Sequence, residues 1–165
     1  MSDMLVKLYD LPEREALLPS LQNAGIEVRL AIPPEKHVVV EWVRSTFNSH
    51  WASECEAAFS RQPVSCYIAT APRADADGNN TRKMIGFACY DATAKAFFGP
   101  TGVDPEARGL GVGKELLIAA LHAMRAEGYA YGIIGSAGPA DFYAKLVGAV
   151  EIPGSSPGIY RGMLR

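Results

Sequence analysis

Apolar and polar positions alternate in several short stretches of the chain, which is the pattern of strands with one buried face. The clearest stretch is Ile26–Ile32, where four aliphatic residues alternate with polar ones. The Asp-, Gly- and Asn-rich stretch Pro72–Arg82 predicts an exposed hairpin loop. The other apolar runs that predict strands are Met4–Leu8, Val64–Ala71, Met84–Tyr90, Ala94–Val103, Tyr129–Ser136, Ala149–Ile152 and Gly158–Leu164.

Helical spacing of apolar residues is strongest in Glu115–Glu127, where Leu117, Ala120, Leu121 and Met124 form one stripe. Gly128 follows as a stop signal. The other predicted helices are Glu13–Asn23, Glu35–Phe47, Ala52–Phe59 and a helix that Gly138-Pro139 opens and Gly148 ends. Within Glu35–Phe47 the run Val38-Val39-Val40 also fits a strand. Strands mixed with helices in this order predict an α/β fold with a mixed sheet.

A glycine-rich stretch precedes the strongest helix. The run from Val103 to Leu117 contains Arg108, Gly109, Gly111, Gly113 and Lys114 within seven residues. Glycines let another group approach the backbone closely. The first turn of a helix carries unpaired N–H groups and a partial positive charge. The stretch therefore predicts an anion site, for which phosphate is the usual occupant.

Two familiar phosphate loops do not fit this stretch. A Walker loop needs glycine where Arg108 stands and Ser or Thr where Glu115 stands. A dinucleotide GxGxxG pattern fails because Lys114 or Leu116 occupies the place of its last glycine. A helix start that uses its glycines only for tight packing remains the structural alternative.

The remaining pattern is Arg-x-x-Gly-x-Gly, read as Arg108, Gly111 and Gly113, with Val103-Asp104-Pro105 ahead of it. This stretch resembles the coenzyme A pyrophosphate loop of the GNAT superfamily of N-acetyltransferases. The resemblance covers about Ile26 to Leu164. It implies a GNAT-like mixed central sheet flanked by helices and splayed between the fourth and fifth core strands. We expect residues 1–165 to form one such domain, with residues 1–25 as an N-terminal extension.

The resemblance also implies a set of site residues. The pantetheine arm would pair with the end of the strand before the loop, and a backbone N–H there, Val103 as the first choice, would polarise the thioester carbonyl. Tyr143, one helix after the loop, would protonate the departing thiolate. The residues expected to bind acetyl-CoA are Gly102, Val103, Arg108, Gly109, Gly111, Val112, Gly113 and Lys114.

The general base and the acceptor are less defined. Many family members carry a glutamate on the strand before the loop, but Lys95–Val103 contains no acid. Asp91, Glu54, Glu56, His37 and His50 are the titratable residues nearby, and each also fits a solvated helix face or a cap. An α-amino acceptor, which is partly neutral at physiological pH, would need little help from a base. An acceptor pocket between the first two helices would be lined by Phe47, Asn48, His50 and Trp51.

Composition limits the setting. A chain of 165 residues with a formal charge of −2 predicts one globular domain and no general attraction for nucleic acid. The sequence contains no run long enough for a membrane span and no signal-peptide pattern near its start. Three cysteines without C-x-x-C spacing favour buried free thiols over disulfides or a metal site, and with them a cytoplasmic location. A homodimer stays an open hypothesis.

We therefore expect an N-acetyltransferase that moves the acetyl group of acetyl-CoA to a primary amine. The acceptor would be a small molecule or a peptide, and its amine would attack directly in a ternary complex. A non-catalytic sensor of CoA or acyl-CoA on the same fold is the alternative from another functional class. An enzyme that uses a different phosphate ligand is the third hypothesis.

Overall fold

A single seven-stranded sheet forms the frame of the protein in the computed structural model, which describes residues 1–14 and 18–165. The strand order is β2-β3-β4-β5-β6-β1-β7. All neighbours in the sheet are antiparallel except β5 and β6. The strands are β1 (Met4–Lys7), β2 (Glu27–Leu30), β3 (Cys66–Ala74), β4 (Asn80–Tyr90), β5 (Phe97–Val103), β6 (Tyr131–Ile134) and β7 (Val150–Glu151).

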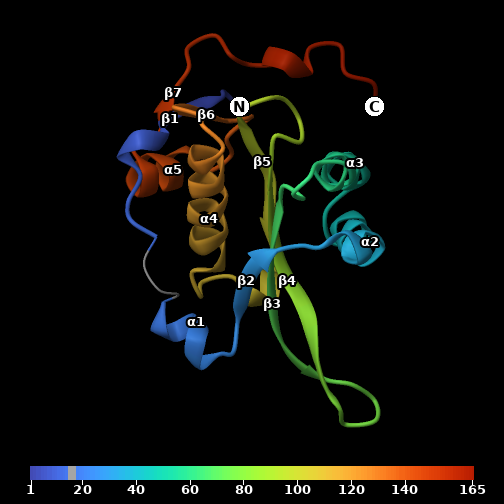
Figure 1. The fold of residues 1–165 in the computed structure, drawn as a ribbon. Coiled ribbons are helices and arrows are strands. Elements are labelled where there is room, and N and C mark those ends of the chain that lie inside the picture. Colours follow the sequence, from blue (N-terminus) through green and yellow to red (C-terminus); the bar gives the residue numbers. More distant parts are fainter. Residues whose placement is uncertain (15–17) are drawn as a thin grey trace.

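Helices cover both faces of the sheet (Figure 1). On one face lie α2 (Lys36–Thr46) and α3 (Ser49–Phe59), and on the other lie α4 (Val112–Ala126) and α5 (Ala140–Val147), with the short α1 (Pro19–Asn23) below them. Two apolar clusters result, one between each helical layer and the sheet. The GNAT-like mixed sheet flanked by helices is therefore confirmed. No helix within residues 1–14 and 18–165 has the length and apolarity needed to cross a membrane.

The pairing of β5 with β6 is short. Only Phe97 with Ile133 and Phe98 with Ile134 stand in register, although β5 continues to Val103. Beyond these pairs the two strands diverge, and this is the splay expected between the fourth and fifth core strands. β1, which belongs to the N-terminal segment, lies between β6 and β7 in the same sheet.

The predicted closing strand Gly158–Leu164 is wrong. Residues Gly158–Tyr160 form a short 3-10 turn instead. Gly158 and Gly162 both have positive φ values, 59° and 73°, so the backbone bends away from the extended conformation twice. The β3–β4 hairpin also differs from expectation. Its strands reach Ala74 and Asn80, so the predicted loop Pro72–Arg82 is mostly strand.

Several helix boundaries differ from the predicted ones. The helix predicted over Glu13–Asn23 begins only at Pro19, because the residue before a proline avoids the helical conformation; residues 15–17 lie outside the described part of the chain. Helix α4 begins at Val112, inside the glycine stretch and three residues before the predicted start. The ambiguous Val-rich stretch is helical, and Val39, Val40 and Val43 form its buried face.

A buried carboxylate closes the end of the sheet where β5 and β6 pair. The Asp91 side chain is only 2% exposed and lies 3.4 Å from the Arg61 guanidinium. It accepts hydrogen bonds from the Ala96 backbone N–H at 2.6 Å and from the Tyr129 hydroxyl at 2.9 Å. Asp91 therefore joins the β4–β5 turn to the segment that leads into β6.

Replacing Asp91 with Asn should lower the free energy of unfolding by about 2 kcal/mol. The amide keeps the shape of the side chain but loses the charge that strengthens these hydrogen bonds. Urea denaturation followed by circular dichroism measures the change. Asp10→Asn is the matched control, because Asp10 pairs with Lys7 at the surface, where ion pairs contribute little. Equal stability of the two variants would contradict a role for Asp91 as a structural anchor.

Candidate active site

A cavity of about 930 Å³ lies where β5 and β6 diverge. Its walls come from several parts of the fold, among them the β4–β5 turn with Ala92 and Thr93. They also include Phe98, Gly99, Pro100 and Thr101 of β5, the end of β6 and the residues after it (Ile134–Pro139), Tyr143 of α5, and Asn48, His50, Trp51, Ser53, Glu54 and Ala57 at the start and in the body of α3. The C-terminal segment, which crosses from β7 toward α3 (Figure 1), contributes Ser156, Pro157, Ile159, Tyr160, Met163 and Arg165.

The backbone at the end of β6 is fixed in an unusual conformation. Ser136 has a φ of 46°, which lies in the left-handed region. This conformation costs free energy for any residue that carries a side chain. The buried Asp3 side chain accepts a hydrogen bond from the Ser136 N–H at 2.7 Å, while the Ala137 N–H donates to the Ser2 carbonyl. The N-terminal segment thus holds the end of β6 away from β5 and keeps the cavity open.

The edge of β5 that faces the cavity carries free backbone groups. The Asp104 N–H donates to the Ile85 carbonyl of β4 at 2.8 Å. Because successive residues of a strand turn their backbone groups to opposite sides, Gly102 also faces β4, whereas Thr101 and Val103 face the opening. Pairing with β6 has already ended at Phe98. An extended ligand can therefore pair with this edge as an added strand.

The glycine stretch lies beyond the end of this edge. Gly109 and Gly111 have φ values of 85° and 93°, so the backbone conformation explains both glycines. A side chain at Gly111 would also contact Leu18 of the N-terminal segment. Gly113 is different, because its φ is not positive and an added Cβ would meet only Val103, at an ordinary 3.6 Å. Neither backbone conformation nor packing requires glycine at position 113, which fits a backbone that a ligand approaches.

The start of α4 has the features of an anion-binding position. Gly111 is its N-cap residue, and no side chain of the described residues caps the first turn. The N–H groups of Val112, Gly113 and Lys114 therefore lack helical partners. Arg108 and Lys114 are exposed on either side and add positive charge. An uncapped helix start with cations beside it has the features that favour an anion such as phosphate.

Gly102 and Val103 connect the loop to the cavity without lining it. The distance from Gly99 to Val103 along the strand is about 13 Å. Gly102 also has a structural reason to be glycine, because a side chain there would overlap the Phe47 ring. Within the cavity itself, Thr101 offers the backbone N–H that faces the opening.

Tyr143 projects from α5 into the cavity wall. Tyr143 is only 6% exposed to solvent, and its ring packs edge-on against Phe98 and Phe142. Burial raises the pKa of its hydroxyl above the ordinary 10.0, so the phenol stays protonated at neutral pH. A protonated hydroxyl in an apolar wall can donate a proton to a strong base formed beside it.

A second group of polar side chains faces the cavity from α3. The Thr93 hydroxyl donates to the Glu54 carboxylate at 2.6 Å. Burial raises the pKa of Glu54 above its ordinary 4.5, although the Thr93 hydrogen bond and the charge of His50 oppose this shift. The half-buried Tyr160 lies in the same region. Burial raises the pKa of its hydroxyl most, and the negative charges of Glu54 and Asp3 raise it further.

The other predicted site residues lie in different places: some line the cavity and others do not. Asn48, His50 and Trp51 line the cavity, but Phe47 packs on Gly102 and lies in an aromatic cluster with Trp42, Trp51 and Phe87. The expected pocket between the first two helices is instead a cavity between α3 and the splay. His37 and Glu56 border a different, shallow groove beside α2, and Asp91 serves the structural network described above.

Sequence reasoning did not find Thr93 and Tyr160. Both stand in irregular segments that no periodic pattern marks, and they approach Glu54 only through the tertiary fold. Glu54 itself was among several candidates because a helix pattern does not show which acid turns toward a cavity.

Comparison with known proteins gives a consistent result for the fold. A model of the Acetyltransferase (GNAT) family matches residues 36–148, which is more than half of the chain. None of the curated protein sequences compared with the chain matches it significantly.

Solved structures share the fold at low sequence identity. One is the glucosamine N-acetyltransferase region of a fungal multi-domain β-N-acetylglucosaminidase, with a TM-score of 0.69 and 15% identity over 92% of this chain and 19% of that one. Another is a GCN5-related N-acetyltransferase from Sphaerobacter thermophilus, with a TM-score of 0.61 and 18% identity over 92% and 48%. A Drosophila protein has a TM-score of 0.56 and 15% identity over 92% and 47%. The chain thus spans less than half the length of each.

Proposed function

The chain belongs to the Acetyltransferase (GNAT) family, and from this premise we propose that it transfers an acetyl group from acetyl-CoA to a primary amine. One observation supports the proposal: the free edge of β5 joins a helix start without a side-chain cap to a cavity that contains a buried tyrosine and a half-buried glutamate. The family membership supports the donor. The three free, buried thiols suit a reducing compartment, so the proposal places the protein in the cytoplasm.

Binding of the donor would use the two parts of this path. The backbone N–H groups of Val112, Gly113 and Lys114, with Arg108 beside them and the turn glycines Gly109 and Gly111, would hold the pyrophosphate. Thr101, Gly102 and Val103 would support the pantetheine arm, with Thr101 and Val103 supplying backbone hydrogen bonds. The arm leads the thioester toward the cavity, where the Thr101 N–H would polarise its carbonyl. An oriented donor of this kind lowers the barrier of acyl transfer by about 3 kcal/mol.

The two titratable groups would then manage the protons. Glu54 would take a proton from the attacking amine, because its raised pKa makes it a stronger base than an exposed carboxylate. Tyr143 would give a proton to the departing thiolate. The nitrogen–carbon bond forms as the carbon–sulfur bond breaks, and none of the three cysteines lines the cavity to form a covalent intermediate.

The proposed acceptor is a small-molecule or peptide amine. Glu54 would attract it as a cation, and Trp51 and Tyr160 would contact its apolar part. An α-amino group stays the favoured acceptor, since its ordinary pKa of about 7.7–8.0 lies closer to that of a carboxylate than a lysine ε-amine does.

Acetyl-CoA with a panel of amines, read as release of free thiol, tests the whole proposal. We expect acceptor-dependent thiol release by the wild-type protein. Gly113→Val should weaken acetyl-CoA binding tenfold or more, about 1.4 kcal/mol, because the branched side chain occupies the space of the pyrophosphate. Calorimetry measures the affinity.

Val38→Ala is the matched control, since Val38 is exposed on α2 and lies on the opposite helical layer. Unchanged affinity in a folded Gly113→Val variant would overturn the loop assignment. Tight binding without thiol release for any amine would instead favour the non-catalytic sensor.

Replacing Tyr143 with Phe should reduce kcat about 100-fold and leave acetyl-CoA affinity unchanged, because the ring stays and only the proton donor is lost. Steady-state kinetics and calorimetry separate the two effects. Tyr9→Phe serves as the control, since Tyr9 is exposed beside Tyr131 and away from the cavity. If Tyr160→Phe loses turnover while Tyr143→Phe does not, Tyr160 is the acid and the assignment fails.

Glu54→Gln should reduce kcat by about 100-fold and change its pH dependence. The base works only when deprotonated, so wild-type activity should fall as the pH drops through the raised pKa of Glu54, above 4.5. The variant should lack this acidic limb. Glu56→Gln, on the same helix but exposed outside the cavity, should retain the wild-type profile. An identical acidic limb in Glu54→Gln would show that another group is the base.

A further inference from the structure

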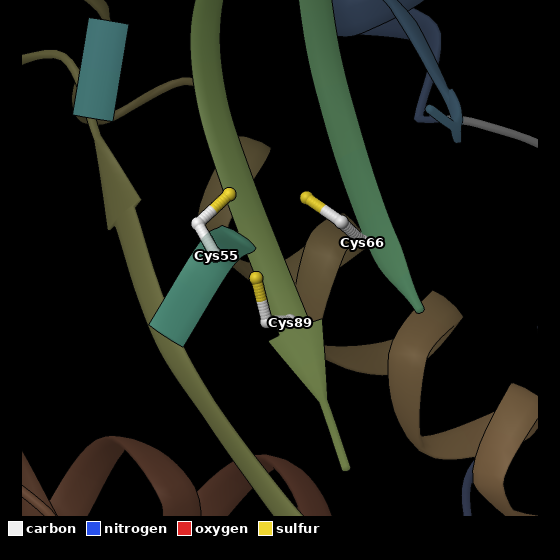
Figure 2. Close-up of side chains that lie close together, drawn as sticks. All are labelled: Cys55, Cys66 and Cys89. Carbon is white, nitrogen blue, oxygen red and sulfur yellow. The ribbon is translucent and has the colours of Figure 1, made fainter. Parts of the chain in front are cut away.

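All three cysteines of the chain meet at one point of the core, although they stand far apart in the sequence. Cys66 and Cys89 are directly opposite each other on β3 and β4. Cys55 approaches them from α3, and Figure 2 shows the three sulfur atoms gathered between the helix and the two strands. The sulfur atoms all lie within 4.8 Å of one another, and each residue is fully buried.

This spacing is close to that of a three-sulfur coordination site. With a bond of about 2.3 Å from each sulfur to a central ion, as in zinc thiolates, the sulfurs of a trigonal site lie about 4 Å apart. The three side chains need to move together by less than about 1 Å to reach that geometry.

The surroundings determine which ion fits. The sulfurs lie in an apolar cluster with neighbours such as Ala52, Val64 and Phe87, and the described residues add no fourth ligand to the group. Zinc prefers four ligands, and three thiolates around Zn²⁺ or Cu⁺ would leave a net negative charge in this apolar layer. Burying a net charge there is strongly unfavourable. A trivalent ion with three thiolates is neutral and avoids that cost.

We propose that Cys55, Cys66 and Cys89 form a binding site for a trivalent thiophilic ion, for which arsenite is the probe. Arsenous acid exchanges its three hydroxyl groups for the three sulfurs. Three arsenic–oxygen bonds break, three arsenic–sulfur bonds form, and each thiol proton leaves with a hydroxyl as water. Arsenic remains trivalent, so no oxidant or reductant is required.

Entry of the ion requires only a local opening of α3, since α2 and α3 form a separate layer over the sheet (Figure 1). The same helix turns Trp51 and Glu54 toward the cavity. Binding of the ion draws Cys55 toward the sheet, so the fluorescence of Trp51, one turn before it, reports on occupancy. This readout is independent of acetyl transfer.

The test uses the full-length folded protein with arsenite. Native mass spectrometry should show one added arsenic atom minus three hydrogens, and X-ray absorption at the arsenic edge should show three sulfur neighbours. Circular dichroism should confirm that the fold is retained. Because the chain contains no other cysteine, every arsenic–sulfur bond comes from this cluster.

Cys55→Ala is the first variant, because alanine suits a helix and leaves the strand pair in place. It should bind arsenite at least tenfold more weakly, with two sulfur neighbours in place of three, and lose the fluorescence change. Cys66→Ala should behave likewise if it folds; the conclusion does not depend on it.

Two results would overturn the proposal. One is a wild-type protein in which arsenic has two or fewer sulfur neighbours, or binds only after the circular dichroism signal of the fold is lost. The other is preference for Zn²⁺ or Cu⁺ over arsenite in a direct competition, which would show that charge does not determine the choice.

Discussion

The separation of β5 from β6 is the constraint on which the rest of the structure depends. A parallel pair of strands normally continues its hydrogen bonds, and free backbone groups in the middle of a sheet are unfavourable. Here pairing ends after Phe98, and the C-terminal half of β5 keeps an edge within the sheet. The cavity and the free edge of β5 both follow from this one divergence.

Two carboxylates stabilise the divergence from opposite ends. Asp91 fixes the paired end through Ala96, Tyr129 and Arg61, and Asp3 fixes the open end through the Ser136 N–H. Both accept backbone hydrogen bonds where the chain takes a positive φ, at Ala96 and Ser136. Both acids therefore stabilise strained backbone. Among the residues that the structure describes, Glu54 is the acid that lines the cavity.

The sequence predicted the local parts of the fold. Periodicity located most strands and helices, because it depends on neighbouring residues. The glycine stretch indicated that a helix follows it, although α4 begins three residues before the predicted start. The prediction of a strand over Gly158–Leu164 was wrong because glycines in the left-handed conformation interrupt its apolar residues. Glu54, Thr93 and Tyr160 stand in three separate segments, so only the tertiary fold brings them together. Similarly, β1 joins the sheet far from its neighbours in sequence, which a local pattern does not reveal.

Helix α3 shows why residue type alone was a poor guide to function here. Glu54 and Cys55 are adjacent in the sequence, yet one faces the polar cavity and the other the apolar layer beside the sheet. The helical rotation of about 100° per residue separates the two environments. A single helix thus forms one wall of the cavity and one side of the sulfur cluster. Because Glu54 and Cys55 belong to the same helix, the position of α3 determines the surroundings of both side chains.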